Sequence, residues 1–178
     1  MEKDIEIATF AGGCFWCSED AFRKKEGVIS VVSGYVSDKE NELKPNYEIV
    51  STGKTLFREG VQITFNPNII SYEELLTIYW RHIDPTQDDG QFADRGFHYT
   101  TAIYYHNTVQ KEIATKSKQE LEKSKKFNKE IMTKIIPLGI FYKAEQYHQD
   151  YSNKNPNHYE MYSIGSGRKG FIEKNWRD

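Results

Sequence analysis

Residues 5–17 read IEIATFAGGCFWC and place a glycine turn between an apolar strand and a helix. The β-prone first half predicts a short strand, and Gly12 and Gly13 permit a tight turn directly before Cys14. Beyond the turn, apolar and small residues follow a 3.6-residue period until Gly27, which indicates an amphipathic helix. This stretch therefore predicts a cysteine at the start of a helix that follows a strand.

The rest of the chain predicts further strands and two helices. Ser71 and Glu74 form a capping box that begins a helix, and Pro85 ends it. A long basic helix is expected from Thr108 to about Phe127. Strands are predicted over Val28–Val36, Val61–Phe65, Tyr99–Tyr105 and Ile131–Ile136.

This order of elements predicts the fold class. Strand, helix, strand, strand, helix, strand, with an added helix and strand, indicates an α+β two-layer sandwich with a ferredoxin-like (split βαβ) core and a mixed, mainly antiparallel sheet. Residues 142–178 have few aliphatic side chains and are expected to wrap the sheet as a long irregular C-terminal tail. The 178 residues suit a single domain, with a core of about residues 4–137.

Composition excludes several classes of protein. The chain has 24 basic and 26 acidic residues, and its pI near 6.2 disfavours nucleic-acid binding. No stretch has the roughly 18 to 20 apolar residues of a membrane span, and residues 1–7 lack the pattern of a secretory signal. We therefore expect a cytoplasmic protein with no membrane or nucleic-acid partner, and a monomer by default.

Cys14 and Cys17 are the only cysteines of the chain. At a helix start the unpaired N–H groups and the helix dipole stabilise an anion, so Cys14 is expected to form a reactive thiolate. At helical spacing the two side chains lie roughly 5 to 6 Å apart, so Cys17 is a candidate resolving thiol that closes a disulfide. The alternative is that a cysteine here is a small core residue.

The same residues allow a metal site or a substrate pocket as alternatives. A zinc site would need two more ligands, and the five histidines offer no closely spaced pair, so no metal is predicted. Phe15 and Trp16 could anchor the helix in the core or line a small apolar substrate pocket. The lysine-rich stretch from Lys111 to Lys134 is interpreted as a solvated face.

Four blocks of this sequence resemble the peptide methionine sulfoxide reductase type A family. The first is Gly13-Cys14-Phe15-Trp16 after the apolar strand. The others are Asn46-Tyr47-Glu48 with Ser51-Thr52-Gly53, the stretch DRGFHYTTAIYY over 94–105, and FYKAEQYHQ over 141–149 with Lys154-Asn155-Pro156. The resemblance spans about Ile5 to Pro156 and implies one domain of this type over residues 1–178.

The resemblance implies a role for each matching residue. Without it, Glu59 would be interpreted as a surface carboxylate and the tyrosines as half-buried packing residues. The resemblance implies that Cys14 is the nucleophile and that Glu59 is the proton donor. Tyr47 and Tyr99 would bind the sulfoxide oxygen, and Asp94 would be a supporting polar group. Phe15 and Trp16 would hold the S-methyl group of the substrate.

The implied reaction reduces the S epimer of methionine sulfoxide, free or in oxidised proteins, without a cofactor. Glu59 would need a raised pKa, which burial against aromatic residues supplies. Cys14 becomes a sulfenic acid, Cys17 condenses with it to a disulfide, and thioredoxin or a similar reductant reopens that bond.

The sequence differs from the family pattern at two places, and two alternative functions remain open. Leu56-Phe57-Arg58 replaces a flexible, polar approach to Glu59, and Glu160 stands near where many relatives carry a resolving cysteine. Recycling must then use Cys17 or an external thiol. The alternatives are a general dithiol–disulfide oxidoreductase, since C-x-x-C also occurs in thioredoxins, and a non-catalytic redox sensor or methionine-peptide binding module.

Overall fold

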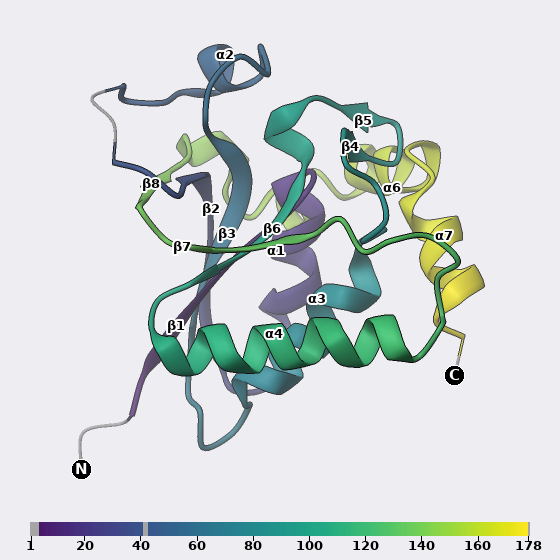
Figure 1. The fold of residues 1–178 in the computed structure, drawn as a ribbon. Helices are drawn as coiled ribbons and strands as arrows, with labels where there is room; N and C mark the ends of the chain where they lie inside the picture. Colours follow the sequence, from purple (N-terminus) through teal and green to yellow (C-terminus); the bar gives the residue numbers. More distant parts are fainter. Residues whose placement is uncertain (1–3, 41–42, 178) are drawn as a thin grey trace.

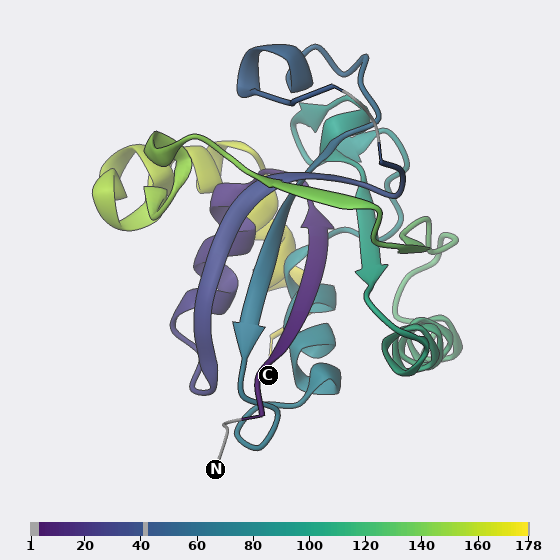
Figure 2. The same ribbon diagram turned by 90° about the vertical axis from the view of Figure 1, so that its left-hand side faces the viewer.

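A six-stranded sheet forms the centre of the molecule in this computed structural model, which describes residues 4–40 and 43–177. The strand order is β7-β6-β1-β3-β2-β8, and only the β6–β7 pair is parallel. The predicted mixed, mainly antiparallel sheet is therefore confirmed (Figure 2). Its strands are β1 (Glu6–Gly12), β2 (Val28–Ser37), β3 (Arg58–Phe65), β6 (Thr101–Tyr105), β7 (Lys134–Pro137) and β8 (Ile140–Lys143).

Three helices cover this sheet. Helices α1 (Phe15–Arg23) and α3 (Tyr72–His82) contact each other and the central strands, and α4 (Thr108–Lys123) lies along β6 and β7 (Figure 1). The core between them is largely aromatic: the ring centroid of Phe10 lies 4.9 Å from that of Tyr79 and 5.6 Å from that of Phe22. The Tyr79 hydroxyl also donates to the carbonyl of Ala11 at 2.8 Å, which fixes the end of β1.

Local sequence signals predicted these elements well. Ser71 Oγ accepts from the backbone N–H of Glu74, and Glu74 Oε2 accepts from that of Ser71, so the predicted capping box is present. The predicted strands and both long helices are found, with ends that differ by a few residues. Strand β8 was not predicted as a separate element, because it consists of four residues and depends on pairing with β2.

The C-terminal segment is largely helical, so the prediction of an irregular tail is wrong. It contains α5 (Tyr151–Lys154), α6 (Pro156–Gly165) and α7 (Arg168–Asn175). These helices carry no aliphatic stripe because they pack through tyrosine rings and a buried arginine. Figure 1 shows α6 and α7 in yellow beside the hairpin of β4 (Gly90–Gln91) and β5 (Asp94–Arg95), and the Ala93 N–H donates to the Ser166 carbonyl at 3.1 Å.

None of the helices within residues 4–40 and 43–177 has the length and hydropathy that a membrane crossing requires.

Candidate active site

The glycine turn between β1 and α1 places Cys14 at the N-cap of the helix, as predicted. Gly13 has φ +82°, and a Cβ there would lie 2.7 Å from Cβ of Gln91 and 2.8 Å from Nη2 of Arg168. Only glycine fits this conformation and this space. Cys14 and Cys17 are both free and buried, with exposed fractions of 5% and 4%.

The two thiols form a hydrogen bond with each other and ionise differently. Burial raises the pKa of Cys14 well above its usual range. The pKa of Cys17 is lowered to about 7, because the Cys14 thiol donates a hydrogen bond to it and the Arg168 guanidinium attracts its negative charge. The first ionisation of the pair thus falls on Cys17. This differs from the expected Cys14 thiolate, because the hydrogen bond from Cys14 and the charge of Arg168 act on Cys17 and outweigh the effect of its burial.

Glu59 lies inside the molecule, only 2% exposed, so its interpretation as a surface carboxylate is wrong. It stands on β3 opposite Tyr35, and its Oε2 accepts from the Phe15 backbone N–H at 3.1 Å. Burial raises the pKa of Glu59 to about 8, the negative charge of Asp94 adds to that rise, and the Phe15 hydrogen bond opposes it. The carboxyl therefore holds its proton at neutral pH.

Tyr47, Tyr99 and Asp94 come from three separate segments and meet around this carboxyl. Tyr47 begins α2 (Tyr47–Val50) and Tyr99 ends the short 3-10 helix η1 (Phe97–Tyr99). Their hydroxyls form a hydrogen bond, and burial followed by the charge of Glu59 raises the pKa of both. Asp94 on β5 accepts a hydrogen bond from the Tyr162 hydroxyl. Cys14 lies within electrostatic range of both Tyr47 and Tyr99.

Phe15 and Trp16 take different positions. Phe15 is 1% exposed and belongs to the main core, with its ring 4.9 Å from that of His148. Trp16 is half-buried, stacks on Tyr151 at a centroid distance of 3.7 Å, and donates its indole N–H to Nδ1 of His148 at 3.1 Å. Tyr162 meets the indole edge-on at 5.8 Å. Trp16 is thus held from several sides.

Three residues of the C-terminal helices reach the cysteines and were missed in the sequence. The Tyr162 hydroxyl lies close to Cys14 and donates to Asp94, and the Tyr159 hydroxyl lies close to Cys17 and donates to Asp20. Arg168, at the start of α7, is 3% exposed. A usable signal was present, because Pro156 is a preferred first helical residue and tyrosines three apart share one helix face.

Phe57 and Arg58 hold the chain directly before Glu59 through packing and hydrogen bonds. Phe57 is fully buried and packs edge-on against Tyr142. Arg58 donates through Nε to Oγ1 of Thr100 at 2.7 Å and through Nη1 to the Tyr104 hydroxyl at 3.0 Å. These contacts tie β3 to β6 and to the segment that carries Tyr99.

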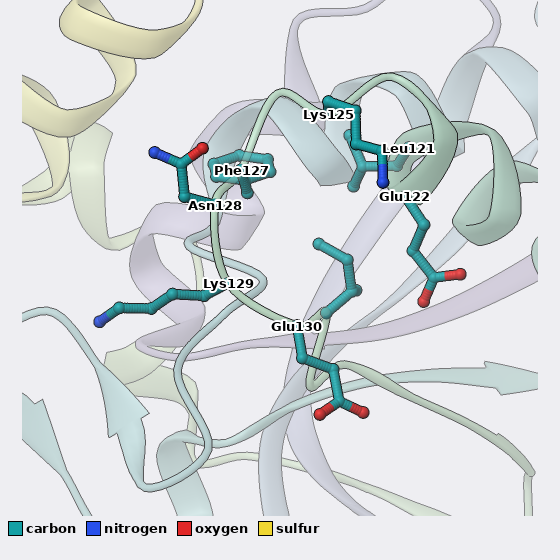
Figure 3. A pocket seen from close by; sticks show the side chains of 8 residues that line it. Leu121, Glu122, Lys125, Phe127, Asn128, Lys129 and Glu130 are labelled. Atoms are coloured by element: carbon teal, nitrogen blue, oxygen red, sulfur yellow. The ribbon is translucent and has the colours of Figure 1, made fainter.

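A cavity of about 420 Å³ at the end of α4 does not belong to this site (Figure 3). None of its lining residues is a predicted site residue. They are Leu121, Glu122, Lys125, Phe127, Asn128, Lys129, Glu130 and Ile131. The described part of the chain contains no cluster of three His, Cys, Asp or Glu side chains able to hold a metal ion.

The mixed α/β fold and the buried thiol pair at a helix start define a cysteine-based oxidoreductase. The model of the peptide methionine sulfoxide reductase family matches residues 6–178, and the chain belongs to this family.

Its relatives match along almost their whole length. The peptide methionine sulfoxide reductase MsrA of Bacillus velezensis is 52% identical over 178 residues, covering 100% of this chain and 99% of the relative. The Bacillus subtilis MsrA is 51% identical over 176 residues, covering 99% and 98%.

Solved structures show the same fold. Reduced Mxr1 from Saccharomyces cerevisiae superposes with a TM-score of 0.80 at 31% identity, covering 88% of this chain and 89% of that chain. Methionine sulfoxide reductase A of Corynebacterium diphtheriae gives 0.75 at 29% identity, covering 88% and 77%.

Proposed function

We propose that this protein reduces methionine S-sulfoxide, free or in oxidised proteins, with Cys14 as the nucleophile and Glu59 as the proton donor. The observation that carries the assignment is Glu59, a buried carboxyl that keeps its proton at neutral pH and contacts the backbone beside Cys14. A carboxyl in this state can protonate the oxygen of a bound sulfoxide.

In the first step the Cys14 sulfur attacks the sulfoxide sulfur. Glu59 gives its proton to the oxygen, and the Tyr47 and Tyr99 hydroxyls donate hydrogen bonds to it. Two electrons pass from the Cys14 sulfur to the sulfoxide sulfur, methionine leaves, and the oxygen remains on Cys14 as a sulfenic acid. The proton lost by the Cys14 thiol restores Glu59, so the step consumes no external proton. Phe15 and Trp16 would hold the S-methyl group, and Asp94 would support the polar side of the site.

In the second step Cys17 resolves the sulfenic acid. The Cys17 thiolate attacks the Cys14 sulfur, the S–S bond forms, and the S–O bond breaks to release water after protonation. A dithiol reductant such as thioredoxin then reduces the disulfide. Support comes from the hydrogen bond between the two thiols and from the absence of any third cysteine in the sequence.

We further propose that residues 1–178 form one domain of this family and that its core, about residues 4–137, belongs to the ferredoxin-like class. The order β6-β1-β3-β2, with α1 and α3 packed on it, supports that class. Two cysteines only three residues apart suit redox chemistry in a reducing compartment such as the cytoplasm. We expect a monomer with oxidised proteins and thioredoxin as partners.

A single-turnover assay with separated S and R epimers of a methionine sulfoxide peptide tests the reaction. Without added reductant, wild type should convert only the S epimer, and both thiols should disappear. Cys14→Ser should give no product, and retained turnover would remove the central assignment. Product from neither epimer, together with reduction of insulin disulfides, would favour a general oxidoreductase instead.

Cys17→Ser separates the two steps. It should release about one methionine per enzyme and then stop, because the sulfenic acid has no neighbouring thiol. Undiminished cycling with thioredoxin would show that Cys17 is not the resolving residue.

A further inference from the structure

Arg168 carries a buried positive charge that no carboxylate neutralises. Its side chain is only 3% exposed, and no ion pair among the described residues includes it. Nη1 donates to the His82 carbonyl at 2.6 Å, Nη2 donates to the Gly12 carbonyl at 2.9 Å, and Nε has no partner. The guanidinium carbon lies 4.7 Å from the ring centroid of Phe92.

Such an arrangement is costly unless an anion lies near. Arginine stays protonated in proteins, and a buried charge without a counter-charge is strongly disfavoured. Carbonyl oxygens and an aromatic face recover part of that cost. The position of the guanidinium indicates which anion is available. Nη2 lies against the Gly12–Gly13 turn, directly before Cys14 and the helix that contains Cys17, and the guanidinium charge acts on Cys17.

We propose that Arg168 is the cationic partner of the Cys17 thiolate and that this pairing sets the rate at which Cys17 closes the disulfide. The inference rests on the proposed resolving role of Cys17. In that step the paired thiolate supplies two electrons to the Cys14 sulfur, and the departing hydroxide is protonated to water. Arg168 is therefore a positioning residue that acts through Cys17 and does not touch the substrate.

The other groups around Cys17 do not replace this charge. The Cys14 thiol and the Tyr159 hydroxyl lie close to the thiolate but carry no positive charge, and the Tyr159 hydroxyl donates to Oδ2 of Asp20. Asp94 and Glu59 oppose its ionisation when they are charged. His82, whose carbonyl binds Arg168, is buried, and that burial lowers its pKa well below the usual range, so its ring is neutral. The groups acting on Cys17 are Cys14, Glu59, Asp94, Tyr159, Tyr162 and Arg168.

The first test titrates the Cys17 thiolate by its ultraviolet absorbance in full-length Cys14→Ser protein. Adding Arg168→Met should raise the midpoint by about one pH unit or more. Adding Arg168→Lys instead, which keeps the positive charge, should leave the midpoint close to that of Cys14→Ser alone. Lys169→Met is the matched control, since it removes an exposed positive charge from the same helix and should leave the midpoint unchanged.

The second test follows methionine release and thiol loss separately in one turnover of protein with both cysteines. Arg168→Met should release methionine normally but close the disulfide at least about threefold more slowly at pH 7, with the difference gone by about pH 9.5. If Arg168→Met does not fold, Arg168→Gln keeps hydrogen-bond donors and removes only the charge.

Two outcomes separate this inference from the proposed function. An unchanged titration midpoint and an unchanged closure rate in the charge-removing variant would overturn the pairing, and a lowered melting temperature alone would then mark Arg168 as structural. Wild type that makes methionine yet keeps a free Cys17 thiol would instead overturn the resolving role itself.

Discussion

At the scale of single residues, Glu59 shows how burial converts an ordinary side chain into an acid that works at neutral pH. Its pKa of about 8 comes mainly from burial among aromatic residues, and the nearby Asp94 adds to it. Phe57 contributes to this burial environment, and Arg58 contributes to the adjoining hydrogen bonds.

Glu59→Gln should slow the first chemical step by about 100-fold or more, because the amide cannot give up a proton. In wild type the rate of this step should fall as the pH rises through about 8, where Glu59 ionises. Rapid-quench measurement of methionine release over pH 6 to 10 checks both points. An equal rate in the variant would mean that another group supplies the proton.

Glu59 also makes stability depend on pH. Its pKa is about 8 in the folded protein and near 4.5 when exposed, so the folded state binds more protons between those values. The stability contributed by the protonated carboxyl is complete below pH 4.5 and is lost as the pH rises to about 8. The free energy of unfolding of Glu59→Gln relative to wild type should therefore rise by up to about 1.4 kcal/mol per pH unit in this window.

Urea unfolding of both reduced proteins at several pH values measures this difference. Glu48→Gln, which changes an exposed carboxylate on α2, is the control and should show no such trend. Parallel stability curves for wild type and Glu59→Gln would contradict the raised pKa of Glu59.

At the scale of elements, α3 is set by its own sequence. The reciprocal bonds between Ser71 and Glu74 satisfy two N–H groups that a helix start otherwise leaves unpaired. Ser71→Ala should therefore lower the free energy of unfolding by about 1 kcal/mol. Thr77→Ala, at an exposed position on the same helix, is the control and should have little effect; equal losses in both would argue against the cap.

Strand β8 and helix α6 escaped prediction because contacts with distant segments hold them, even though Pro156 at the start of α6 is a local signal. Strand β8 is held by pairing with β2, and α6 buries none of its residues completely. Their stability comes from contacts with distant segments, which neither periodicity nor composition records. By contrast, the strands and helices with a clear repeat of apolar residues were predicted correctly.

At the scale of the whole molecule, one glutamine fastens the C-terminal segment to the sheet. Gln149 accepts from the Ser33 backbone N–H at 2.9 Å and donates to the Ser33 carbonyl at 2.8 Å and the Ala144 carbonyl at 3.0 Å. The side chain therefore satisfies backbone groups of β2 beyond the end of its pairing with β8. These hydrogen bonds hold the chain just before α5, α6 and α7, the helices that cover the thiols.

Gln149→Leu should lower the free energy of unfolding by about 2 to 4 kcal/mol, because it leaves buried backbone groups without partners. Gln146→Leu, an exposed neighbour, is the control for the same chemical change. Urea unfolding measures both, and a loss no larger in Gln149→Leu than in Gln146→Leu would show that the contact does not stabilise the fold.

The sequence by itself determined the strand, glycine turn and helix that carry Cys14, because these depend on neighbouring residues, and its motifs identified the family. Only the tertiary structure decided which thiol ionises first. Arg168, Tyr159 and Tyr162 lie far along the chain from the cysteines, and Asp94 reaches them from a separate hairpin. Charge and burial act through space, so the ionisation of the two thiols is a property of the folded molecule.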